Sequence, residues 1–334
     1  MENTPTFSEY VCLIYNRFEA FIQGSASARN MGHPYVYQEQ KMLVFFMWMQ
    51  FRRIFKFKTQ ERWLKTHPEA LAILSWESIP HRSTLSRRYK ALYPLLQEFI
   101  LFVGQDSTDL GEDLQTRHLY EDKSLFKAQG AVWHQSDRAA GRIPDKVRQL
   151  DTDATWSKSA YHGWVYGYGL HLTCNHAGFP LLIEVETATF SEKEAIARKE
   201  AVILHQLHPE TLGGDDAYTL CKRIRTWASH GVSLLAPALR WRNGRYAQAY
   251  RRFLKQPDMA QRLRSRKTAI EPVFDLIAKL LGLTGKQKQL PIARLSNVQT
   301  CIALAVLSLQ FAMLANSIWQ LPFRSISSIQ GAFA

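Results

Sequence analysis

The feature that most constrains the fold is a short apolar run at residues 99–103, followed by a glycine and then by Asp106. Five consecutive apolar residues bounded by a glycine favour a buried central strand over a helix. A carboxylate at the end of such a strand is costly unless it is solvated, hydrogen-bonded or bound to a metal. The run therefore predicts a central strand that delivers Asp106 either to a turn or to a polar site.

The charge balance is the most informative part of the composition. The 334 residues include 42 Lys and Arg against 29 Asp and Glu, which gives a formal net charge of +13. A chain this basic is expected to bind a polyanion, and nucleic acid is the first candidate. The four cysteines are far apart and form no Cys-x-x-Cys pair, so neither a zinc site nor a disulfide framework is expected.

One segment, residues 301–319, has nearly the composition of a membrane span. It contains Gln310 and Asn316 and is barely long enough to cross a bilayer, so a buried C-terminal helix is expected instead. Residues 1–8 lack the basic-then-apolar layout of a signal peptide. We therefore expect a cytoplasmic protein that does not bind membranes.

The N-terminal region reads as helical. Apolar helical segments at residues 7–23 and 36–57 precede a short helix at 69–75, a turn at Pro80 and a second helix that Ser83 caps. This order is typical of a helix-turn-helix DNA reader, and the alternative is a solvated basic helix. The residues expected to contact DNA are Arg82, Ser83, Thr84, Arg87, Arg88 and Lys90.

The rest of the chain alternates strands and helices. After a polar stretch without a clear period at residues 109–160, strands at 163–175 and 179–187 form a hairpin. Ser191, with Glu194 three residues on, caps the next helix. A short strand then leads to Asp215, and a helix through 227, a strand at 231–237 and a helix at 268–281 that bears Glu271 follow.

This order is that of an RNase H-like fold, in which acids from two strands and one helix converge. Three such carboxylates can hold two Mg²⁺ or Mn²⁺ ions, because these cations prefer oxygen ligands. Two ions stabilise both the attacking and the leaving oxygen of a phosphoryl transfer. The predicted fold class is thus α/β, with an RNase H-like catalytic domain behind an all-helical DNA-binding domain.

Three motifs carry a family resemblance: Asp106-Ser107-Thr108 after the apolar run, Asp215-Asp216-Ala217-Tyr218 before a helix, and residues 270–274 within a helix after a basic run. With them the chain resembles the DDE transposases of bacterial insertion sequences over nearly its whole length. Residues 151–156 and 166–171 look like the stretch that these enzymes carry between their first two acids.

The resemblance implies that Asp106, Asp215 and Glu271 are the catalytic, metal-binding acids. The family's second acid stands three residues before the Tyr, which selects Asp215 over Asp216. Asp151 and Asp153 compete with Asp106 as the first acid, but the residues before them are too polar for a central strand. Many relatives carry a Lys seven residues after the Glu, where this chain has an Ala followed by Lys279.

The implied protein is a transposase that binds the terminal inverted repeats of its element as a homodimer on double-stranded DNA. It would cleave the ends and join them to target DNA, acting on the nucleoid. The expected division is a DNA-binding domain at residues 1–93, a catalytic domain at 94–321 and a tail at 322–334. Within the basic run at 240–267, Arg264, Arg266 and Lys267 are expected to contact DNA phosphates beside Glu271. The alternatives are a DNA-binding derivative without catalysis and another RNase H-like nuclease.

Overall fold

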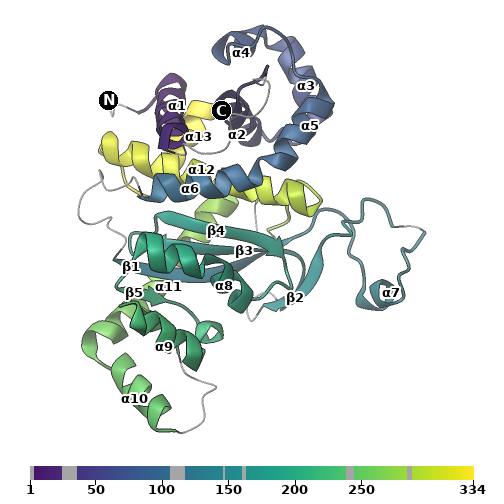
Figure 1. Ribbon diagram of the computed structural model, residues 1–334. Coiled ribbons are helices and arrows are strands. Elements are labelled where there is room, and N and C mark those ends of the chain that lie inside the picture. Colours follow the sequence, from purple (N-terminus) through teal and green to yellow (C-terminus); the bar gives the residue numbers. More distant parts are fainter. Residues whose placement is uncertain are drawn as a thin grey trace. The chain divides into compact units, whose positions relative to one another are not determined.

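The computed structural model (Figure 1) divides the chain into two compact units. Unit 1 combines Met1–Val103, Lys127–Ala154 and Ile277–Ala334, and unit 2 combines Gly104–Phe126 and Thr155–Leu276. The C-terminal helices thus belong with the N-terminal ones, whereas the predicted boundaries at 93 and 321 place residues 295–318 in the catalytic domain and 327–333 in the tail. The structure describes residues 4–24, 36–105, 117–145, 147–159, 163–237, 244–283 and 288–334.

Unit 1 is helical. Its helices are α1 (Phe7–Gly24), α2 (Glu39–Phe51), α3 (Phe57–Thr66), α4 (Pro68–Ile73), α5 (Arg82–Ala91), most of α6 (Tyr93–Gln105), α7 (Gln135–Ala139), α12 (Leu295–Ile318) and α13 (Ser327–Phe333). Helix α5 begins at Arg82 rather than after Ser83. Its N-cap is His81, whose Nδ1 accepts a hydrogen bond from the Ser83 backbone N–H at 3.3 Å.

Helix α12 forms the core of unit 1. It is apolar on all sides, as expected for a helix surrounded by protein, and 89% of its most apolar 18-residue window is buried. Its polar side chains bond to neighbouring helices: Gln310 Nε2 donates to the Ile100 carbonyl at 2.9 Å, and Thr300 Oγ1 donates to the Tyr89 carbonyl at 2.8 Å. The predicted buried C-terminal helix is confirmed, although α12 is also long and apolar enough to cross a membrane.

The end of the chain, predicted as a tail, forms helix α13. Phe333 is fully buried there, with its ring centroid 4.9 Å from that of Phe7 and 5.0 Å from that of Phe51. The hydroxyls of Tyr10 and Ser328 also lie within hydrogen-bond distance, at 2.8 Å.

The predicted central strand at residues 99–103 is wrong, because these residues belong to α6. Buried apolar residues recur there at helical spacing, namely Leu95, Leu96, Phe99, Ile100 and Val103. The Phe99 ring packs against Phe18 and Phe21, each with its centroid at 5.2 Å. Asp106 itself lies outside the described residues.

Unit 2 is built on a mixed sheet, so the chain as a whole is a mixed α/β protein. The strands are β1 (His118–Lys127), β2 (Thr155–Ser159), β3 (Gly163–Asn175), β4 (Pro180–Thr187), β5 (Thr211–Gly213) and β6 (Ser233–Leu235). Their order is β2-β3-β1-β5-β6, with β4 also paired to β3. The predicted β3–β4 hairpin is confirmed as antiparallel, whereas β1, β5 and β6 run parallel to one another. Strands β1 and β2 arise from the stretch in which no period was visible.

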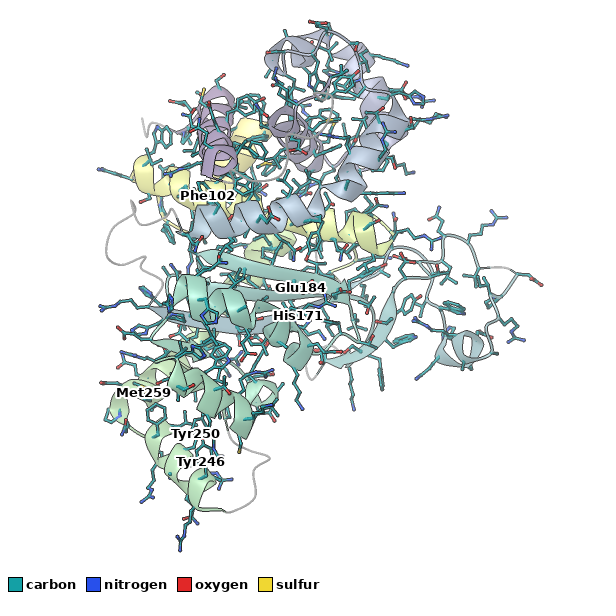
Figure 2. The ribbon with its side chains drawn as sticks, in the orientation of Figure 1. Phe102, His171, Glu184, Tyr246, Tyr250 and Met259 are labelled. Atoms are coloured by element: carbon teal, nitrogen blue, oxygen red, sulfur yellow. The ribbon has the colours of Figure 1, made fainter. Side chains whose placement is uncertain are left out.

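The helical elements of unit 2 are α8 (Glu192–Val202), a π-helical turn at Ile203–Leu207, a 3₁₀ turn at Asp216–Tyr218, α9 (Cys221–Ser229), α10 (Arg245–Leu254) and most of α11 (Pro257–Leu280). The predicted capping box of Ser191 and Glu194 is present. Tyr250 fixes α10 to the end of β6 (Figure 2): its hydroxyl donates to the Leu234 carbonyl at 2.7 Å and accepts from the Ala236 N–H at 3.1 Å.

Candidate functional site

Strand β1 places two consecutive carboxylates, Glu121 and Asp122, at the centre of unit 2. Because neighbouring side chains of a strand point to opposite faces, these two acids have different surroundings. Both belong to the polar stretch in which the sequence showed no period. Neither was a predicted site residue.

Glu121 belongs to a closed network. Its side chain is fully buried, and Lys199 Nζ donates to its two carboxylate oxygens at 2.8 and 3.1 Å. The Thr173 hydroxyl also donates to Glu121, and Lys199 Nζ gives a further bond to the His171 carbonyl at 3.0 Å. This network is saturated by protein groups, as a buried ion pair has to be.

His171 lies beside this network in β3 (Figure 2) and is completely buried. Burial, followed by the positive charges of Lys199 and Lys123, lowers the pKa of its imidazole to about 2. The ring is therefore neutral at any working pH. A structural role fits this position.

Asp122 faces the other way and is more open. Its Oδ2 lies 2.5 Å from Arg266 Nη1, and 21% of its side chain is exposed. Burial, opposed by Arg266 and reinforced by the nearby charge of Asp215, raises the pKa of Asp122 to about 6. A carboxylate with a raised pKa beside a second carboxylate is typical of a functional site.

Asp215 reaches the same place from the neighbouring strand. Strands β1 and β5 are parallel, and the last pairs of their register are Leu119 with Leu212 and Tyr120 with Gly213. Two residues further on come Asp122, still within β1, and Asp215, just beyond the end of β5. The two carboxylates therefore lie near each other, and the charge of Asp215 acts on Asp122. The pKa of Asp215 is also raised, chiefly by burial and further by the charge of Glu192.

Two glycines allow β5 to end in this way. A Cβ on Gly213 would lie 2.8 Å from the ring of Tyr120, and one on Gly214 would lie 2.6 Å from the ring of Tyr218. Asp215 then caps the 3₁₀ turn, because its Oδ1 accepts the Ala217 N–H at 2.8 Å. The Gly-Gly-Asp sequence thus brings the backbone close to two aromatic rings and fixes the position of the carboxylate.

Lys123 ties the site to the loop before α8. Its Nζ donates to the carbonyls of Ala188 and Phe190 at 2.9 and 2.7 Å. Burial lowers the pKa of Lys123, whereas the charges of Glu192 and Asp215 act in the opposite direction. This lysine therefore holds the start of α8, with Glu192 in its first turn, next to the Asp122–Asp215 pair.

Two of the three predicted catalytic acids, Asp106 and Glu271, are not placed beside Asp215 by the described residues. Asp106 lies outside the described residues, and the strand on which its selection rested is a helix. Glu271 is exposed on α11, five residues after Arg266 and hence about 140° around the helix from it. Within the described ranges, no three His, Cys, Asp or Glu side chains form a group that could hold a metal.

Asp151 and Asp153, the competing first acids, have a structural role in unit 1. Asp151 Oδ2 accepts the backbone N–H of Arg294 and Asp153 Oδ2 accepts that of Leu295, each at 3.0 Å. These are the donors at the start of α12, where carboxylates are favoured.

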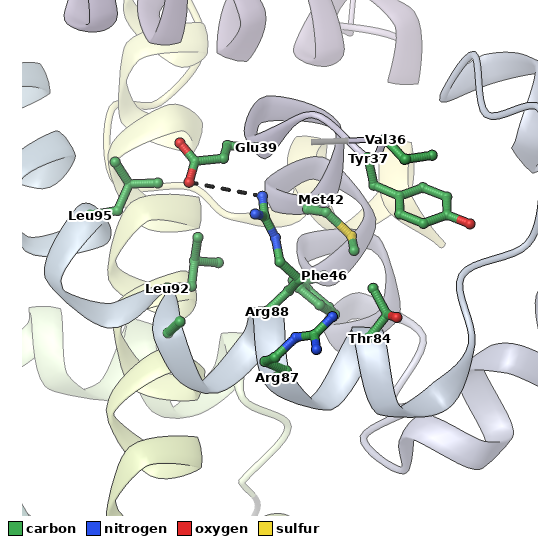
Figure 3. Close-up of a pocket in the computed structure, with 11 residues that line it drawn as sticks. Val36, Tyr37, Glu39, Met42, Phe46, Thr84, Arg87, Arg88, Leu92 and Leu95 are labelled. Atoms are coloured by element: carbon green, nitrogen blue, oxygen red, sulfur yellow. Dashed lines mark ion pairs between the residues drawn. The ribbon is translucent and has the colours of Figure 1, made fainter. Parts of the chain in front are cut away.

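The residues predicted to read DNA divide between two sides of α5. Thr84, Arg87 and Arg88 line a cavity of about 500 Å³ with apolar walls (Figure 3). Arg88 is largely buried there and points towards Glu39, with 3.8 Å between Nη2 and Oε1. Arg82 and Ser83 line a different cavity, and Lys90 is exposed. On α11, Arg264 and Lys267 are exposed, whereas Arg266 binds Asp122.

Comparison with known proteins gives only weak neighbours. No family model matches the chain, and no curated protein matches it. A solved structure of a Mos1 transposase paired-end complex with left transposon end is 12% identical, covers 84% of this chain and 89% of its own, and has a TM-score of 0.21. A pre-cleavage Mos1 transpososome is 10% identical, covers 85% and 89%, and has a TM-score of 0.18. Scores this low do not establish a shared fold.

Proposed function

We propose that this protein is a transposase-like enzyme that cuts and joins DNA, with its metal site built on Asp122 and Asp215. The observation that carries the proposal is the position of these two acids. Each stands two residues after the last printed pair of two adjacent parallel strands, Tyr120 with Gly213, and Asp215 raises the pKa of Asp122. Asp215 is retained from the sequence prediction, and Asp122 takes the place of Asp106.

The order of elements supports this choice. Strand β1 with Asp122 is followed by the β3–β4 hairpin, α8, β5 with Asp215, α9, β6 and α11. That is the order expected of an RNase H-like enzyme, with the first acid on β1. Glu271 stays the predicted third acid on α11, although the described geometry does not bring it to the pair.

The pair fits Mg²⁺ or Mn²⁺ by its donor atoms. Both groups offer only carboxylate oxygens, and Mg²⁺ is commonly held by one or two carboxylates together with water and substrate phosphate. Such an ion would activate the attacking oxygen and stabilise the leaving one. Arg266 already places a positive charge against Asp122 and so balances it in the free protein.

DNA is the substrate that best suits the surroundings. Arg264 and Lys267 are exposed on α11 beside Arg266, and the chain carries a net charge of +13. Cations next to the carboxylates would offset the repulsion between those carboxylates and the phosphates. Assembly as a homodimer on terminal inverted repeats stays a prediction.

The test is metal-dependent cleavage of DNA that carries the element ends, with the full-length chain. Asp122→Asn and Asp215→Asn should each abolish cleavage while leaving metal-free DNA binding intact. Asp216→Asn is the matched control, since it removes the adjacent carboxylate and should retain activity. Full cleavage by Asp122→Asn would contradict the assignment, and DNA binding without cleavage by the wild type would indicate a binding protein.

A further inference from the structure

A second cavity, open to solvent, lies entirely within unit 1, where α3 and α5 begin and the chain enters α12. Its volume is about 490 Å³. Lys56 and Lys58 line it from the start of α3, and Arg82, Ser83 and Ser86 line it from the first turns of α5. Three cations and two hydroxyls thus surround one space.

The cations of this cavity have no acidic partner in the part of the chain that the structure describes. Lys56, Lys58 and Arg82 form no ion pair with any described carboxylate, and all three are exposed. The Glu61 carboxylate reaches the same corner, but it is held by Lys65 Nζ at 2.9 Å and by the Arg82 backbone N–H at 3.3 Å. The cavity therefore carries an uncompensated positive charge.

The helix ends add to that charge. The first turns of α3 and α5 contain no acid, and Lys56, the N-cap of α3, makes no side-chain capping bond. Helix N-termini favour negative groups, so Lys56, Lys58 and Arg82 stand where cations are least favourable. An anion bound between them would remove this repulsion and accept the N–H groups of α3.

The floor of the cavity is partly apolar. Phe57 and Ile292 line it, together with Asn297. A ligand with an anionic group and an apolar body, such as a sugar–phosphate unit, suits these walls better than a bare ion.

The cavity on the opposite side of α5 has a different character. There Arg88 is ion-paired with Glu39, and the walls are formed by apolar side chains such as Met42 and Phe46 (Figure 3). The two faces of one helix thus differ in which cations are available to a ligand.

We propose that the cavity lined by Lys56, Lys58 and Arg82 is a phosphate-binding site that holds the sugar–phosphate backbone of duplex DNA. The phosphate chemistry rests on the cavity itself, whereas the choice of DNA as the partner rests on the proposed function. Helix α5 then contacts DNA through its Arg82–Ser83–Ser86 face, whereas Arg88 on the other face pairs with Glu39.

The test is duplex binding without divalent metal, measured by fluorescence anisotropy across a salt series. The double variant Lys56→Gln/Lys58→Gln should weaken binding and reduce the slope of log affinity against log salt by about 0.9 for each lost phosphate contact. Arg62→Gln is the matched control: it removes one exposed cation of α3 that does not line the cavity and should leave the slope unchanged. Arg87→Gln tests the opposite face of α5 and should have a smaller effect than the double variant. Circular dichroism checks that each variant is folded.

A second arm separates DNA from small anions. Sulfate should raise the melting temperature of the wild type more than that of the double variant. Stabilisation by sulfate with an unchanged duplex slope would overturn the DNA assignment, because it indicates a small-anion site. A larger effect of Arg87→Gln than of the double variant would overturn the choice of face. Both measurements are made without divalent metal, so their results do not depend on whether the proposed metal site is correct.

Discussion

Glu121 and Asp122 are neighbours on β1, yet their carboxylates lie on opposite faces of the strand and have different surroundings. Glu121 is fully buried and bound by Lys199 and Thr173. The Asp122 side chain is partly exposed and forms an ion pair with Arg266. Its pKa is raised to about 6, in part by the charge of Asp215.

The difference separates an acid with a structural role from the one that we propose binds a metal. Every oxygen of Glu121 is already used by a protein donor, so this face has no place for a ligand. The Asp122 face pairs two carboxylates with raised pKa values and a single arginine. Both oxygens of Asp122 also accept hydrogen bonds, Oδ1 from the Lys123 backbone N–H at 2.9 Å and Oδ2 from Arg266, but this carboxylate is partly exposed and lies near the charge of Asp215. An added cation would reduce the repulsion between the two acids.

The largest expected effect comes from breaking the buried ion pair between Lys199 and Glu121. Lys199→Met leaves Glu121 buried without its cation, and we expect a loss of about 3–5 kcal/mol in the free energy of unfolding. Arg198→Met is the control, because Arg198 is half-exposed where it pairs with Glu184 and Glu186, and such a pair contributes about 1 kcal/mol or less. Urea denaturation measures both, and similar losses would show that the Glu121 network is not special.

The contribution of Asp122 to the free energy of unfolding should depend on pH. Because the pKa of Asp122 is about 6 in the folded protein and 3.8 in the reference state, the folded protein holds this proton more tightly. Its contribution to stability is therefore greatest at acidic pH and is lost as pH rises from about 4 to about 6.

In Asp122→Asn this pH-dependent loss should disappear, which amounts to about 1–3 kcal/mol at pH 8 relative to the wild type. Urea denaturation of both proteins between pH 4 and pH 8 measures it. If Asp122→Asn and the wild type show the same pH profile, Arg266 fully offsets the effect of burial on the pKa of Asp122.

The contrast on β1 also explains what the sequence could and could not reveal. The β3–β4 hairpin, the Ser191 cap and the buried α12 follow from local patterns, and the structure contains each of them. Strand β1 has three charged residues at its centre, so no apolar alternation is visible. Their partners are remote: Lys199 follows Glu121 by 78 residues, and Arg266 follows Asp122 by 144.

One sequence expectation failed, and one pair of acids that was considered as an alternative has a role that the sequence does not show. The run at 99–103 is short and apolar, and only the additional apolar residues before it reveal the helical period of α6. The acids at 151 and 153 resemble a catalytic motif, but they cap a helix that begins more than 140 residues later, which no local pattern can show. Apolar pairs flanking the charges of β1, Leu119–Tyr120 and Leu125–Phe126, were the one available sign of a strand.

The smallest expected effect tests whether Asp122 and Asp215 act on each other. The charge of Asp215 raises the pKa of Asp122, so Asp215→Asn should lower that pKa by a fraction of a unit to about 1 unit. Carboxyl chemical shifts followed by NMR during a pH titration measure the change. Asp216→Asn is the control. Asp216 helps to raise the pKa of Asp215, whereas the pKa of Asp122 is set by burial, Arg266, Lys123 and Asp215. If Asp215→Asn leaves the titration of Asp122 unchanged, the two carboxylates are too far apart in solution to share a metal ion.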